Sequence, residues 1–208
     1  MTPELITTFV LASTLLAFAP GPDNLFVLTH AALHGSRAGL LVTLGLCTGL
    51  VGHTALVTLG VAALIMVSTT AFLLLKLAGA AYLLWLAWQT WRAGAAKGRD
   101  SDKPVLGARQ LYLRGILMNL SNPKVAIFFL AFLPQFARPE ASLPVSVQLL
   151  LFGVLFMLVT LLVFGGIALL AGRIAGILQR SNRAQVLLNR ATALLFVALA
   201  TRLLISSR

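Results

Sequence analysis

Acidic side chains are scarce in this chain, which has 5 Asp and Glu residues against 16 Lys and Arg residues in 208 positions. Charged residues of either sign make up only 10% of it, whereas soluble domains carry about 25%. Hydrophobic residues make up 59% and are spread over the whole length, which leaves no room for a sizeable soluble domain. The composition therefore predicts one integral membrane domain over residues 1–208.

Cysteine and enzyme motifs are also nearly missing. Because Cys47 is the one cysteine, neither an internal disulfide nor a CxxC redox pair can form, and a thiol–disulfide carrier is excluded. The GxSxG and P-loop motifs are absent, so we expect no enzyme and no cofactor. No nucleic-acid-binding module accompanies the excess of basic residues, which we assign to the lipid bilayer and not to nucleic acid.

Six apolar runs are long enough to cross a bilayer, which takes about 20 residues as a helix. They extend over residues 5–33, 38–66, 71–91, 111–136, 146–171 and 185–205. No basic segment precedes the first run, so we expect a retained span and not a cleaved signal peptide. The predicted fold is all-α, with six transmembrane helices.

Basic residues are concentrated in the connections after the first, third and fifth runs, and at the helix ends beside them. The positive-inside rule places such connections in the cytoplasm. Both termini are therefore predicted to lie outside the cytoplasm. The basic residues on the cytoplasmic side are Arg37, Arg92, Lys97, Arg99, Lys103, Arg109, Arg114, Arg173, Arg180, Arg183 and Arg190.

The first and fourth runs are each broken by proline beside a charged residue. Adding 101 to the residue number takes Pro22 to Pro123 and Asp23 to Lys124. With a linker at about 93–109, the two repeats (about 1–92 and 110–208) hold three spans each, and an odd number of spans inverts one repeat relative to the other. Broken helices at matching places in two repeats indicate a transporter binding site.

The first break contains two prolines, Pro20 and Pro22, which lack the N–H that a helix needs. Carbonyls about one turn earlier lose their partners and can bind an ammonium group. Gly21 is expected to permit unusual backbone angles. Asp23 and Asn24 can cap the helix that resumes. A charge at mid-span costs about 2.5–3.5 kcal/mol on insertion scales, so we interpret Asp23 as functional, with capping as part of its role.

The second break supplies the opposite charge. Asn119 and Asn122 provide amide donors and acceptors, Pro123 frees further carbonyls, and Lys124 provides a cation. Lys124 could pair with Asp23 only to neutralise it, or the two could form a switchable pair that a proton or a substrate breaks. The residues alone do not decide between these two readings.

Three other features have weaker implications. Gly45 and Gly49 form a GxxxG pattern that favours close helix packing and allows a homodimer through that face. His53 is a second candidate for a coupling proton beside Asp23, although a hydrogen-bonded structural histidine is the simpler interpretation. His30 and His34 stand at a spacing that suits a metal, but no acidic cluster accompanies them, so we predict no metal site.

Both breaks and their flanks resemble the LysE/RhtB family of bacterial amino-acid exporters, and the homoserine/threonine branch most of all. The resemblance covers nearly the whole chain. It rests on Pro20-Gly21-Pro22-Asp23-Asn24, Gly35-Ser36-Arg37-Ala38-Gly39-Leu40, Asn119-Leu120-Ser121-Asn122-Pro123-Lys124 and Phe132-Leu133-Pro134-Gln135-Phe136.

This resemblance implies an inner-membrane protein that exports amino acids by proton antiport. It implies a substrate site formed by Pro20, Gly21, Pro22, Asp23, Asn24, Asn119, Asn122, Pro123 and Lys124. A cation exporter of related architecture is an alternative, although it would need more acidic residues in the spans than Asp23. A membrane enzyme or assembly factor without transport activity is a second alternative.

Overall fold

The computed structural model describes residues 2–61, 69–93 and 106–205, and these residues form helices joined by short connections, with no strand. The end of the second predicted span and most of the predicted linker lie outside the described residues. The elements are α1 (Pro3–Phe18), α2 (Pro22–His34), α3 (Ser36–Leu56), the π-helix η1 (Val57–Val61), α5 (Thr69–Arg92), α6 (Ala108–Leu120), α7 (Pro123–Ile127), the π-helix η2 (Phe128–Phe132), the 3₁₀-helix η3 (Leu133–Phe136), α8 (Val145–Leu169), α9 (Ala171–Arg180) and α10 (Asn182–Ile205).

Four helices among the described residues are long and apolar enough to cross a membrane, and the number rises to six if each bent helix pair is one span. The two bent pairs are those predicted from proline. Helices α1 and α2 meet at 61°, and α6 meets the segment Pro123–Phe136 at 49°. The prediction of an all-α membrane protein with its first and fourth runs broken is confirmed.

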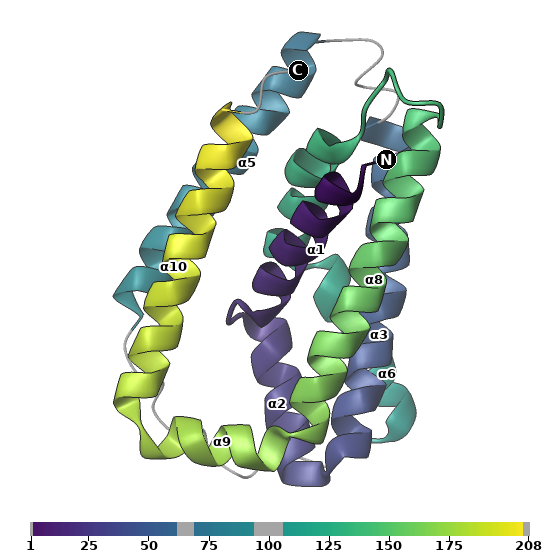
Figure 1. Ribbon diagram of the computed structural model, residues 1–208. Helices are drawn as coiled ribbons and strands as arrows, with labels where there is room; N and C mark the ends of the chain where they lie inside the picture. The colour runs from purple at the N-terminus through teal and green to yellow at the C-terminus, as the bar shows by residue number, and fades with distance from the viewer. Residues whose placement is uncertain (1, 62–68, 94–105, 206–208) are drawn as a thin grey trace.

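The helices run up and down the molecule, and the two ends of the chain lie at the same upper end in Figure 1. The turn between α2 and α3 lies at the lower end, where Gly35 has a φ of 85° that favours glycine. Helix α9 lies across this lower end and joins α8 to α10. We had predicted only a connection there, because a helix of this length is too short to count as a span.

The interior consists of two apolar clusters stacked along the bundle. The upper cluster contains the phenylalanines of α1, η2, η3 and α8, among them Phe9, Phe128 and Phe152. The lower cluster joins α2, α3 and α8 through residues such as Val27, Val42 and Val163. Both helix breaks fall where the two clusters meet, so polar groups at the breaks lie at mid-depth.

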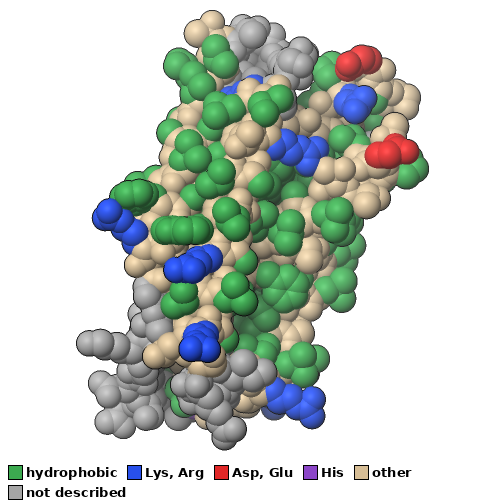
Figure 2. Space-filling model, turned by 60° about the vertical axis from the view of Figure 1, so that its left-hand side comes forward, with side chains coloured by type: hydrophobic (Ala, Val, Ile, Leu, Met, Phe, Trp, Pro, Cys, Tyr) green, Lys and Arg blue, Asp and Glu red, His purple; other side chains and the backbone are tan. Residues whose placement is uncertain are grey.

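The outer surface is mostly apolar. Figure 2 shows the side that carries α5 and α10, where hydrophobic side chains cover much of the surface and the visible acidic side chains lie near the upper end. Leu74 on α5 is 62% exposed and Leu187 on α10 is 69% exposed. Helices with an apolar exterior of this kind are expected to face lipid.

Helix α3 crosses α6 at two glycines. A Cβ added to Gly45 would contact the carbonyl oxygen of Tyr112 and lie 3.0 Å from the Cα of Gly115. A Cβ added to Gly49 would lie 2.7 Å from the Cβ of Asn119. The GxxxG face therefore packs inside the chain, and the suggested homodimer through Gly45 and Gly49 is wrong because α6 already covers this face.

This crossing predicts a clear difference between two glycines. Gly45→Ala places a methyl group against backbone atoms that cannot move away, and we expect a loss of about 1–3 kcal/mol of stability. Gly166→Ala, within α8, meets nothing within 4 Å and should leave stability unchanged or slightly higher. Thermal unfolding in detergent measures both. Equal melting temperatures for Gly45→Ala and the unaltered protein would contradict the crossing.

Candidate functional site

At the first helix break, three backbone carbonyls accept hydrogen bonds from side chains. Helix α1 ends at Phe18, and Pro20 cannot donate to the carbonyl of Leu16. The Nζ of Lys124 donates to the carbonyls of Ala19 (2.9 Å) and Leu16 (3.3 Å). The amide of Asn24 donates to the carbonyl of Ala17 at 2.7 Å. Two of these carbonyls therefore accept from the ammonium group of Lys124, whereas the sequence had suggested that they would bind the ammonium group of a ligand.

Gly21 leaves space at this break because it has no side chain. Its φ of −167° and ψ of 178° are extended, so the expectation of unusual backbone angles was wrong. A Cβ added to Gly21 would lie 3.2 Å from the Nζ of Lys124. The absence of a side chain therefore lets the lysine reach the break.

Asp23 does not cap α2, which corrects the expected capping role. The residue at the cap position is Gly21, no side chain caps the helix there, and Asp23 follows Pro22 inside the first turn. Asp23 is 3% exposed, and the positive end of the α2 helix dipole stabilises the negative charge of its carboxylate. Its Oδ2 accepts a hydrogen bond from the Nδ2 of Asn122 at 2.8 Å, whereas its Oδ1 has no partner.

The second break is held by two side chains. The Oδ1 of Asn122 accepts from the backbone N–H of Lys124 at 3.0 Å and so caps α7, while its Nδ2 donates to Asp23. Pro123 leaves the carbonyl of Asn119 without its helical donor. The Nε2 of His53 donates to this carbonyl at 3.1 Å. His53 is buried, so at this position it has a structural hydrogen bond.

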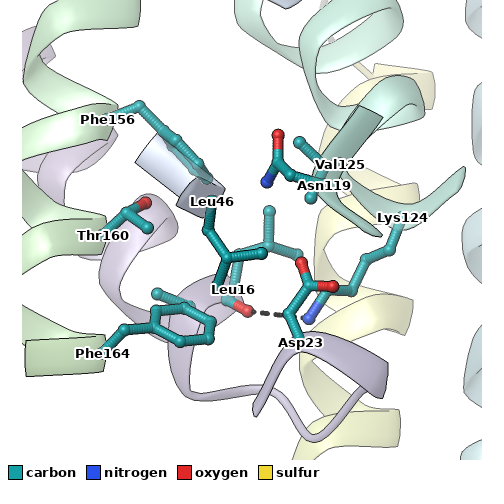
Figure 3. A pocket seen from close by; sticks show the side chains of 10 residues that line it. Leu16, Asp23, Leu46, Asn119, Lys124, Val125, Phe156, Thr160 and Phe164 are labelled. Atoms are coloured by element: carbon teal, nitrogen blue, oxygen red, sulfur yellow. Dashed lines mark hydrogen bonds between the residues drawn. The ribbon is translucent and has the colours of Figure 1, made fainter. Parts of the chain in front are cut away.

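The two breaks therefore hold each other without a direct ion pair between Asp23 and Lys124. Lys124, in the second break, donates to carbonyls of the first break. Asn122, also in the second break, donates to Asp23 in the first. Figure 3 shows the carboxylate and the ammonium side by side at the edge of one cavity. The two charged groups are therefore held in place by hydrogen bonds to other residues, and Oδ1 of Asp23 has no partner.

A small cavity of about 20 Å³ lies at this level, which is room for about one water molecule with the side chains in their present positions. Pockets that hold small molecules are larger, at about 300 Å³ or more, so the surrounding side chains would have to move apart before an amino acid could enter. Three of its lining residues carry a buried oxygen without a partner, namely Oδ1 of Asp23, Oδ1 of Asn119 and Oγ1 of Thr160. Buried polar atoms are normally hydrogen-bonded. Three such atoms around one cavity indicate a place for a polar ligand.

The chain is similar in sequence to known proteins. The family model described as LysE type translocator matches residues 14–207. The chain belongs to the LysE family. It is 38% identical to the homoserine/homoserine lactone efflux protein of Salmonella typhimurium over 208 residues, which cover 100% of this chain and 99% of that protein.

Two other relatives of this LysE-family chain have different named substrates. The cysteine/O-acetylserine efflux protein of Klebsiella pneumoniae is 33% identical over 73% of this chain and 76% of its own length. The leucine efflux protein of Enterobacter sp. is 30% identical over 94% of this chain and 93% of its own length. No solved structure matches the chain significantly.

In this LysE-family chain, only some of the predicted site residues reach the cavity. Asp23, Asn119 and Lys124 line it, and Asn24 and Asn122 are buried beside it with bonds to the breaks. Pro20, Gly21, Pro22 and Pro123 form the breaks and do not line the cavity. Sequence reasoning missed the remaining lining residues, which are Leu16, Ala17, Leu46, Val125, Phe156, Thr160 and Phe164.

The histidine pair on α2 shows no metal site. The rings of His30 and His34 have centroids 5.6 Å apart, and His30 also packs on Phe26 at 4.3 Å. Within the described ranges, no group of three His, Cys, Asp or Glu side chains could hold a metal ion.

The double role of Asn122 can be separated by two substitutions. Asn122→Ser retains a side chain that can cap α7 but is too short to reach Asp23, whereas Asn122→Ala loses both contacts. We expect Asn122→Ala to be the less stable by about 1 kcal/mol, the usual contribution of an N-cap. Thermal unfolding in detergent measures the difference, with Ser121→Ala as a neighbouring exposed control. Identical melting temperatures for the two Asn122 variants would show that the cap does not contribute.

Proposed function

We propose that the protein exports a small neutral amino acid, of the homoserine or threonine type, from the cytoplasm by proton antiport. The observation that carries this proposal is the placement of an unpaired carboxylate oxygen and an ammonium group on one buried cavity. A zwitterionic amino acid has the complementary charges. The family and the named activities of the relatives support amino-acid export.

The amino acid's ammonium group would lie between Oδ1 of Asp23 and Oδ1 of Asn119, two buried acceptors without a partner that line the charged side of the cavity. Its carboxylate would lie at Lys124. A lysine ammonium has three donors, and the carbonyls of Leu16 and Ala19 take two of them. Asn24, Asn122 and the residues Pro20, Gly21, Pro22 and Pro123 would keep the two breaks in the shape that the site needs.

Antiport follows if the proton and the ammonium group compete for the same oxygen. A proton on Oδ1 of Asp23 neutralises the carboxylate and turns its free acceptor into a donor. The ammonium group of the substrate then loses both the charge and the acceptor. His53 is the second candidate for binding the coupling proton. It is a buried titratable side chain, and its Nε2 is hydrogen-bonded to the carbonyl of Asn119 in the second break.

The proposed transport cycle uses two inverted repeats that rock against each other around the site. The bent pairs α1–α2 and α6–α7 support this symmetry, because α2 and α7 both begin at their proline, Pro22 and Pro123. The substrate would bind Oδ1 of Asp23 in the first repeat and the third donor of Lys124 in the second, so it would bridge the two repeats. Movement of one repeat against the other would then depend on whether the substrate is bound.

We also propose that the protein lies in the bacterial inner membrane with both termini outside the cytoplasm. The lower end in Figure 1, where α9 and the turn between α2 and α3 lie, would face the cytoplasm. Arg37 and Arg173 are exposed near this end, as the positive-inside rule requires.

The proton-coupled role of Asp23 can be tested in reconstituted vesicles that carry a proton gradient. Asp23→Asn keeps the size and the hydrogen-bonding capacity of the side chain but cannot bind and release a proton. We expect proton-driven efflux of homoserine to fall at least 100-fold, while Glu140→Gln, at an exposed acid, retains full activity. Full proton-driven efflux by Asp23→Asn would exclude this role.

The orientation can be tested by labelling in spheroplasts, in a Cys47→Ala background. Glu140→Cys lies in the connection between η3 and α8 at the upper end, and Ser36→Cys lies at the first residue of α3, at the lower end. A membrane-impermeant maleimide should label Glu140→Cys in intact spheroplasts and Ser36→Cys only after permeabilisation. The reverse pattern would invert the proposed topology.

A further inference from the structure

Thr160 differs from the other buried threonines in its hydrogen bonding. Thr43, Thr54 and Thr192 each donate to the carbonyl four residues earlier, at 2.8–2.9 Å. This local bond is the usual arrangement for a threonine inside a helix. Thr160, in the middle of α8, makes no hydrogen bond although it is only 4% exposed.

The cavity has two walls of different character. Asp23, Asn119 and Lys124 form one wall, and Phe156, Thr160 and Phe164 form the opposite wall on α8 (Figure 3). The three α8 residues are spaced four apart, so they lie on one face of the helix. On this α8 wall, among the residues described, the Thr160 hydroxyl is the one polar side-chain group between two aromatic rings.

We propose that Thr160 determines substrate specificity by hydrogen-bonding the polar end of a short amino-acid side chain. This inference rests on the proposed function, because the charged wall must first hold the ammonium and carboxylate groups. The side chain of the substrate then points toward α8. A hydroxyl or carbonyl oxygen there satisfies Thr160, while the rings of Phe156 and Phe164 enclose the methylene groups.

An apolar side chain of equal length would leave the Thr160 hydroxyl buried without a partner. Sites built to bond a hydroxyl discriminate against the analogue that lacks it for this reason. The chemistry selected is therefore an α-amino acid with an oxygen near the end of a short side chain. Homoserine and norvaline are matched probes, since they differ only by a hydroxyl against a methyl group.

The test measures efflux of both probes from vesicles containing the purified full-length protein. Thr160→Val keeps the shape of the side chain and removes the hydroxyl. We expect the ratio of homoserine to norvaline efflux to fall roughly five- to tenfold, about the value of one hydrogen bond. Thr160→Ser retains the hydroxyl and should restore most of the ratio. A purely structural role of Thr160 would change both rates together.

Thr192→Val is the matched control. Thr192 is also 4% exposed, but its hydroxyl bonds to Leu188 on α10 and it does not line the cavity. Its ratio should equal that of the unaltered protein. An unchanged ratio in Thr160→Val, or an equal change in Thr192→Val, overturns the inference while leaving amino-acid export intact. If the unaltered protein moves neither probe nor any other amino acid, the proposed function fails and the inference fails with it.

Discussion

A proline inside a membrane helix leaves a carbonyl without its donor, and at mid-depth no bulk water replaces that donor. This constraint determines the arrangement of the centre of the molecule. Lys124, from the second break, donates to the carbonyls of Leu16 and Ala19 in the first. His53, from α3, donates to the carbonyl of Asn119. Each break is therefore stable only because side chains from other helices complete it, and the polar residues of the site are also its structural supports.

Hydrogen bonds between the two breaks also explain how two charged residues are tolerated at mid-depth. A buried charge is costly unless hydrogen bonds compensate it. Lys124 receives this compensation from two carbonyls, and Asp23 receives it from one amide of Asn122 and from the first turn of α2. Asp23 is the less completely satisfied of the two, because its Oδ1 has no partner. The carboxylate of Asp23 can therefore still accept a hydrogen bond from a ligand.

The sequence was sufficient to predict the helical class, the apolar runs and both breaks, because hydrophobic length and proline act locally. The sequence also singled out Asp23, Asn119 and Lys124, which line the cavity, because polar residues in long apolar runs are conspicuous. It could not identify Leu46 or Phe164 as lining residues, because apolar side chains inside an apolar helix carry no local mark. Thr160 carried a weak mark, a single hydroxyl in the middle of α8, but threonines in helices usually bond to their own backbone. Helix α9 was not predicted because only runs long enough to cross a bilayer were counted, and α9 has 10 residues.

The glycines at the centre of the molecule have roles that the sequence predicted only in part. Gly21 was expected to provide backbone freedom. Gly45 and Gly49 were expected to allow close helix packing, which the structure confirms, and to leave open a homodimer through the same face. In the structure all three make room for atoms that arrive from another helix, namely the ammonium of Lys124, the backbone of α6 and the side chain of Asn119. Such a role depends on a long-range contact, which local sequence cannot specify. Lys124 and Asn119 both line the cavity, so the missing side chains at Gly21 and Gly49 provide the space in which these two residues form the charged wall.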